Sequence, residues 1–88
     1  MNSSTDEEPT LAEVTHVFQG KKPYAVAWSK KVKGSVTFSL DLELKVWEGE
    51  EVPKAGTFVV LTDLRKNAHG WRAHHARFMR PEDEAHKQ

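Results

Sequence analysis

The chain has 88 residues, of which 38% are hydrophobic and 30% charged, so it can hold one modest core and is too apolar for wholesale disorder. It has no cysteine, which excludes a disulfide framework and a thiolate metal site, and we expect a reducing, cytoplasmic setting. No run approaches the roughly 20 apolar residues of a membrane helix, and the acidic start is unlike a signal peptide. We therefore expect a soluble protein that is not exported by that route.

The formal net charge is zero, but the charges are distributed unevenly along the chain. Residues 1–14 hold four acids and no base, and residues 81–88 hold three acids and one lysine. Between them, residues 15–80 hold twelve Lys or Arg against six Asp or Glu, a net charge of +6. A basic body with acidic ends is typical of a domain that binds a polyanion, although short acidic ends also serve solubility alone.

The first segments in chain order are a polar tail and a strand. Residues 1–10 cannot bury enough surface to offset their ordering entropy, so we expect them to be disordered. Residues 11–18 are rich in β-branched and aromatic side chains and predict a strand. Glycine and proline in residues 20–23 then predict a turn.

Two further strands follow, separated by a basic loop that ends in glycine. Residues 24–28 alternate large and small side chains, which places Tyr24, Val26 and Trp28 on one face. Residues 35–40 alternate polar and apolar side chains strictly and predict the clearest strand in the chain.

The second half of the chain is less regular. Residues 41–52 fit neither the helical nor the strand period, and we expect an irregular or short helical connection. Residues 57–62 form an apolar run that predicts a buried strand, and residues 63–70 are expected to be a basic loop. In residues 71–79 the alternation slips by one position, which predicts a strand with a β-bulge at His74 and His75.

Five short strands at a spacing of about ten residues, with glycine or proline between them, predict an all-β protein. We expect a small five-stranded antiparallel barrel, or a sandwich, over residues 11–80, with low helix content. Residues 81–88 are expected to be a second disordered polar tail.

The order of these segments resembles the oligonucleotide-binding (OB) barrel, and within it the cold-shock domain. Lys-Pro-Tyr-Ala-Val-Ala-Trp at 22–28 and Ser-Val-Thr-Phe-Ser-Leu at 35–40 stand where that family has two aromatic strands that stack bases. Residues 53–60 and 70–78 look like its closing pair of strands. The sequence departs from the family's Lys-Gly-Phe-Gly-Phe and Val-Phe-Val-His-Phe motifs, and an SH3-like barrel also fits five strands and a basic surface.

Nucleic-acid binding needs a basic surface and exposed rings, and this sequence has both. The predicted stacking residues are Tyr24, Trp28 and Trp71. The predicted phosphate contacts come from loops and from the last hairpin, and they are Lys22, Lys30, Lys31, Arg65, Lys66, Arg72 and Arg77.

The alternative is that the large rings fill the core, because so small a domain needs its large side chains inside. This alternative is favoured for Phe38 and Phe58 and also, less strongly, for Trp28. Trp71 follows a glycine and is close to basic residues, so we expect it to be exposed.

The five histidines raise the question of a metal site, and we expect none. Neighbouring residues on a strand point to opposite faces, so His74 and His75 share one ion only if a bulge intervenes. The acid pairs at 41/43 and 50/51 lie in polar segments that would not raise a carboxyl pKa, and no Ser, His and Asp arrangement stands out from chance. We therefore expect no enzyme and no cofactor.

The sequence thus predicts a non-enzymatic module for single-stranded DNA or RNA. The alternative is a protein-protein interaction module, or a small accessory or inhibitor protein, that docks through a strand edge or an aromatic patch. Rings exposed among lysines favour nucleic acid, whereas buried rings with an apolar patch elsewhere favour a protein partner.

Overall fold

The structure is a computed structural model and describes residues 9–68 and 70–81. The tails predicted at 1–10 and 81–88 fall almost entirely outside these ranges, so their disorder stays a prediction. Thr10 is an exception, because it is buried and begins the first strand.

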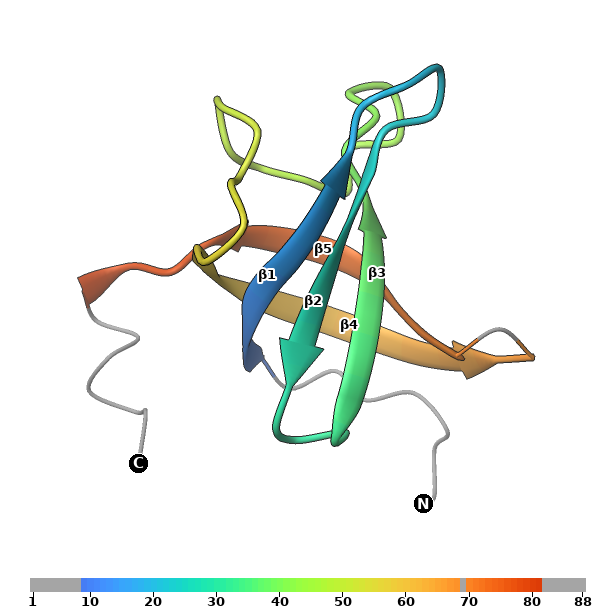
Figure 1. Ribbon diagram of the computed structural model, residues 1–88, viewed down its shortest axis with the longest axis vertical. Coiled ribbons are helices and arrows are strands. Elements are labelled where there is room, and N and C mark those ends of the chain that lie inside the picture. The colour runs from blue at the N-terminus through green and yellow to red at the C-terminus, as the bar shows by residue number, and fades with distance from the viewer. Residues whose placement is uncertain (1–8, 69, 82–88) are drawn as a thin grey trace.

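Five strands make up the described part of the chain (Figure 1). They are β1 (Thr10–Phe18), β2 (Tyr24–Ser29), β3 (Gly34–Ser39), β4 (Phe58–Asn67) and β5 (Gly70–Phe78). They close into a barrel in the order β1-β2-β3-β5-β4, which confirms the predicted small all-β barrel. The neighbouring strands are antiparallel except β3 and β5, which are parallel.

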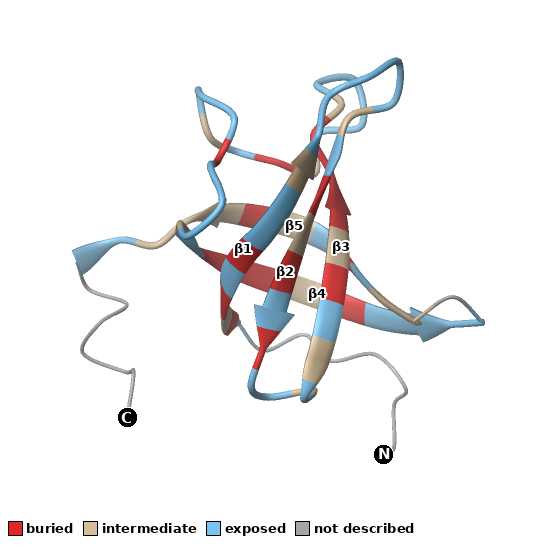
Figure 2. Ribbon diagram, viewed as in Figure 1, coloured by how far each residue is buried: buried red, intermediate tan, exposed pale blue. Residues whose placement is uncertain are grey.

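The barrel interior combines small and large side chains. The inward face of β2 carries Ala25 and Ala27, and β5 contributes two more buried alanines. These small residues leave room for the fully buried Phe38, Leu61 and Leu64, because the interior of a five-stranded barrel is narrow. Figure 2 shows buried and more exposed residues alternating along β2.

Two predictions about the last hairpin are wrong. Residues 63–67 belong to β4 and not to a loop. There is no net register shift at His74 and His75, since the β4 to β5 register is the same on both sides of them. The alternation slips because β4 and β5 both reverse the side that faces the core, between Leu61 and Leu64 on β4 and between Ala73 and Ala76 on β5. Asp63 lies at this place on β4 and has a φ of 57°. The register shift of this sheet lies in β1, between Val14 and His16.

The connection between β3 and β4 seals one end of the barrel. Its Trp47 is buried, stacks on Phe38 with ring centroids 5.7 Å apart, and meets the edge of Phe78 at 4.7 Å. The backbone on either side of Trp47 pairs with Ala76, whose carbonyl accepts the Glu48 N–H at 2.9 Å. The indole N–H donates to the Glu51 carbonyl at 3.0 Å. The segment that fitted neither period therefore adds a core residue and a bridge to β5.

Gly49 is required by space, which leads to a stability prediction. A Cβ at Gly49 would lie 2.5 Å from Trp47 Cζ2 and 2.7 Å from Phe78 Cε2, closer than van der Waals contact allows. We expect Gly49→Ala to lower the free energy of unfolding by about 1–3 kcal/mol, as overpacking of a core usually does. Urea unfolding followed by circular dichroism measures it.

Gly20→Ala is the matched control, because a Cβ there would meet nothing within 4 Å. We expect its free energy of unfolding to stay within about 0.5 kcal/mol of the wild type. Equal stability of the two variants would show that Trp47 and Phe78 move aside freely.

Candidate nucleic-acid interface

The outer face of β2 carries two exposed aromatic rings. Tyr24 is 38% exposed and Trp28 is 47% exposed, while the residues between them on the opposite face are buried alanines. The two rings are four residues apart on one strand, a span of about 13 Å. Tyr24 and Trp28 are therefore surface residues. Of the rings expected in the core, Phe38 is buried as predicted, whereas Phe58 is exposed, so that expectation is wrong.

Two side chains of β1 extend this aromatic surface, and sequence reasoning missed both. Phe18 lies across from Tyr24, and their rings stack with centroids 4.8 Å apart. The His16 ring lies 6.1 Å from Phe18 in a nearly parallel orientation. The register between β1 and β2 brings these rings together, and the register shift near Thr15 hides this alignment from the sequence.

Trp28 has different neighbours on its two sides. Glu13 of β1 lies across from it on one side, and Ser35 of β3 lies across from it on the other. Because Glu13 is exposed and acidic, it repels a phosphate on the β1 side. The β3 side, with its small serine, is the electrostatically open approach to the indole.

Basic residues lie at both ends of β2 and beyond β3. Lys22 is exposed in the turn before Tyr24, and Lys30 and Lys31 are exposed in the turn between β2 and β3. Arg72 of β5 lies beside Thr37 of β3, on the outer side of the wall because the adjacent Val36 faces inward. Lys30 and Lys31 therefore lie at the Trp28 end of β2, Lys22 lies at the Tyr24 end, and Arg72 lies beyond β3.

Arg65 lies opposite Arg72 across the β4 to β5 pair and is already engaged. Its Nε donates to Asp63 Oδ1 at 3.1 Å, and its Nη2 donates to Asp63 Oδ2 at 3.2 Å. The Asp63 carboxylate therefore offsets much of the charge that Arg65 would present to a phosphate.

Three predicted site residues lie apart from the β2 surface. Trp71 pairs with the inward-facing Val36, so its ring is partly buried against the core, with the Lys66 ammonium 5.9 Å from its centroid. Arg77 lies opposite Val60 of β4 and donates to the Phe78 carbonyl at 3.2 Å. Trp71 is half-buried and not the exposed ring expected from the sequence. The structure does not bring these residues together with Tyr24 and Trp28.

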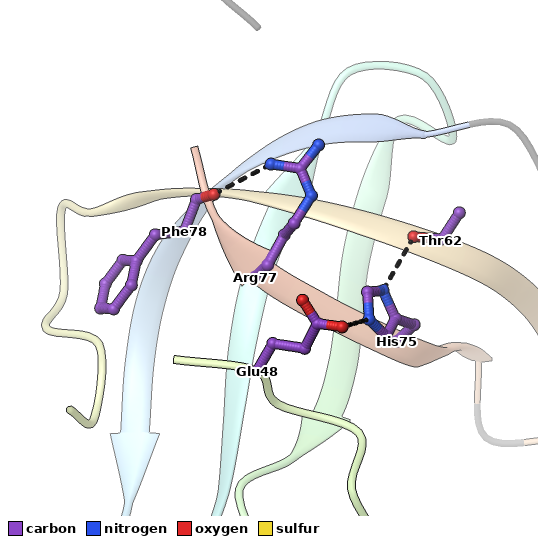
Figure 3. Close-up of polar contacts among 5 residues, drawn as sticks. All are labelled: Glu48, Thr62, His75, Arg77 and Phe78. Carbon is purple, nitrogen blue, oxygen red and sulfur yellow. Dashed lines mark hydrogen bonds and ion pairs between the residues drawn. The ribbon is translucent and has the colours of Figure 1, made fainter. Parts of the chain in front are cut away.

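His75 of β5 bonds to Glu48 of the β3 to β4 connection (Figure 3). His75 Nε2 lies 2.6 Å from Glu48 Oε2, and its Nδ1 lies 3.3 Å from the Thr62 hydroxyl. The hydrogen bond with His75, and then its charge, lower the pKa of Glu48 below the usual value of 4.5. Among residues 9–68 and 70–81, no three His, Asp or Glu side chains are placed to share a metal ion. His69 and His86 were also considered as metal ligands, and they lie outside these ranges.

The Glu48 pKa predicts how stability depends on pH. Because the folded pKa is lower than the unfolded one, the contribution of this group is present above pH 4.5 and is lost as the pH falls through the depressed folded value. We expect the difference in Tm between the wild type and Glu48→Gln to narrow as the pH falls below 4.5. Thermal unfolding by circular dichroism at a series of pH values measures it, and a constant difference would contradict it.

Comparisons with protein-family models, with curated proteins and with solved structures find no match to this chain. The described residues include no helix long and apolar enough to cross a membrane.

Proposed function

We propose that this chain is a non-enzymatic module that binds single-stranded DNA or RNA on the outer face of β2 and β3. The observation that carries the proposal is the exposure of Tyr24 and Trp28 on one face of β2, with lysines in the turns at both of its ends. Exposed rings accept the faces of unstacked bases whatever their sequence, and each stacked base contributes about 1–3 kcal/mol.

The strand order supports this proposal. In an oligonucleotide-binding barrel, which is a five-stranded Greek-key barrel, the face of strands 2 and 3 and the adjoining loops bind the ligand. Here β3 neighbours β5 and not the next strand in the chain, so the barrel is not a simple meander. The candidate surface, on β2 and β3, is the one that this class of barrel uses.

Single strands fit the surface better than a duplex does. A duplex keeps its bases paired and stacked, so they cannot lie flat on Tyr24 and Trp28. The elements of the described ranges are strands, with no recognition helix among them to enter a major groove. The proposed ligand therefore passes along β2 with its bases toward the rings.

The charges favour one path for the backbone. The exposed carboxylate of Glu13 lies on the β1 side of Trp28, while Arg72 lies beyond β3. Lys22 and Lys30, exposed in the turns at the two ends of β2, offer further cations to a backbone that follows this strand. We propose that the bases contact β2 while the backbone runs over the β3 side.

Anisotropy titration with a labelled single strand of about 12 nucleotides, a length within the usual site sizes, tests the proposal. Since each neutralised phosphate contributes about −0.7 to the slope of log K against log salt, four cations predict a slope of about −3. Lys22→Ala and Lys30→Ala should each reduce its magnitude by about 0.7. Arg65→Ala should change it less, because Arg65 is paired with Asp63.

A duplex of the same length is the control ligand, and we expect it to bind more weakly. Absence of binding at low salt, or an affinity that does not depend on salt, would rule out the proposed mode.

A further inference from the structure

The connection between β3 and β4 presents leucines to solvent that the barrel does not use. Leu42 is 77% exposed and Leu44 is 59% exposed, and Val52 further along is also exposed. They do not belong to the core cluster, in contrast to Trp47 of the same connection. The fold therefore gives no reason for apolar side chains at these positions.

The turn that carries the leucines is fixed by its own hydrogen bonds. The Asp41 carboxylate accepts the Glu43 N–H at 2.9 Å, and the Asp41 carbonyl accepts the Leu44 N–H at 3.1 Å. Lys45 ends the turn in the left-handed region with a φ of 55°. Because this backbone is already ordered, a partner that covers the leucines does not have to order it on binding.

A hollow of about 390 Å³ opens beside Leu42 and Val52, between this connection and the turn that joins β1 to β2. The two segments rise from the same end of the barrel (Figure 1). The volume lies at the lower end of the range of ligand pockets, which suits one or a few side chains. The apolar part of its lining comes from Pro23, Leu40, Leu42, Trp47, Gly49 and Val52.

The surroundings of the hollow are acidic, in contrast to the rest of the barrel. Residues 41–51 hold five acids and one lysine. Asp41, Glu50 and Glu51 line the hollow itself together with one cation, Lys21, so its lining has a net charge of −2. One of the five, Glu48, is engaged with His75. Carboxylates at this density repel phosphates and attract cationic side chains, so the charge selects against nucleic acid and for a basic protein segment.

We propose that this hollow docks a segment of a partner protein in which an apolar side chain is flanked by lysine or arginine. The apolar side chain covers Leu42 and Val52 and enters the hollow, and the flanking cations pair with Glu50 and Glu51. The hollow adjoins the Tyr24 end of the proposed stacking surface, at Pro23, and does not include Trp28 at the other end of β2. The chain joins a protein to a nucleic acid if both proposals hold.

Selection of random dodecapeptides displayed on phage against the whole chain tests this inference. We expect the selected sequences to share an apolar residue with lysine or arginine beside it. A synthetic peptide of the selected sequence, labelled with fluorescein, is then titrated with the wild type and with Leu42→Ser/Leu44→Ser. The double variant should bind about tenfold more weakly or worse, as expected for losing central contacts of an interface.

Glu50→Gln/Glu51→Gln should weaken the same peptide and make its binding less dependent on salt. Both double variants should keep the wild-type thermal unfolding curve, because the replaced side chains are exposed. They should also bind the single-stranded oligonucleotide as the wild type does, so a failure of the peptide experiment is distinguishable from a failure of the proposed function.

Several results would overturn the inference. One is an acidic consensus, or no consensus, among the selected peptides. Another is equal affinity of the wild type and Leu42→Ser/Leu44→Ser for the peptide. A third is loss of oligonucleotide binding in Leu42→Ser/Leu44→Ser. Self-association that depends on concentration in sedimentation, and that Leu42→Ser/Leu44→Ser removes, would show that a second copy of the chain covers the hollow instead.

Discussion

Replacing Tyr24 and Trp28 together by alanine is expected to remove most of the affinity for single-stranded DNA or RNA. Two stacked bases contribute about 2–6 kcal/mol between them, so Kd should rise by at least about 30-fold. Fluorescence anisotropy with the labelled oligonucleotide, at one fixed low salt concentration, measures the change.

Trp28 should account for the larger share of this loss. The Phe18 ring stacks against Tyr24 with centroids 4.8 Å apart, so one face of the phenol is already covered. On its β3 side Trp28 has Ser35, which leaves the indole accessible to a base. Trp28→Ala alone is therefore expected to weaken binding more than Tyr24→Ala alone.

Two variants separate loss of stacking from loss of apolar surface. Trp28→Phe keeps a ring at the same place and should retain most of the affinity. Leu44→Ala removes an apolar side chain that is even more exposed than Trp28, from the β3 to β4 connection, and should leave Kd unchanged. An unchanged Kd in the folded Tyr24 and Trp28 double variant would contradict stacking on β2.

The strands were predictable because their side chains alternate with a period of two. That period places Tyr24, Val26 and Trp28 on one face of β2, and the structure confirms that they share a face. The sequence did not decide which face meets water. The alternative that put Trp28 inside came from the need of a small domain for large core side chains, but a narrow barrel takes the alanines of β2 inside and leaves the rings out.

The rest of the surface depends on register, which periodicity does not give. Phe18 meets Tyr24 and Glu13 meets Trp28 because of how β1 aligns with β2, including one register shift. Trp71 looked like a stacking residue beside its basic neighbours. Its parallel partner on β3 is the inward-facing Val36, however, so its ring turns toward the core. Such contacts between distant segments are set by the closure of the barrel.

Trp47 is the residue whose importance the sequence hid most, and its replacement is expected to have the largest effect on stability. It lies in a segment without a period, yet its buried ring joins Phe38 of β3 to Phe78 of β5. Trp47→Ala removes these contacts and leaves a cavity, at a cost of about 3–5 kcal/mol. Since small domains have about 5–15 kcal/mol of stability in total, much of it should be lost. Urea and thermal unfolding by circular dichroism measure the effect.

Trp28→Ala is the matched control, since it removes the same side chain from the surface of the same barrel. Its free energy of unfolding should change by less than about 1 kcal/mol. Trp47→Phe should be intermediate, because it keeps a ring against Phe38 but loses the hydrogen bond to the Glu51 carbonyl. If Trp28→Ala and Trp47→Ala destabilise the chain equally, packing of Trp47 against Phe38 and Phe78 does not stabilise the barrel more than a surface ring does. If only Trp47→Ala does, the loss of binding in Trp28→Ala belongs to the surface and not to the fold.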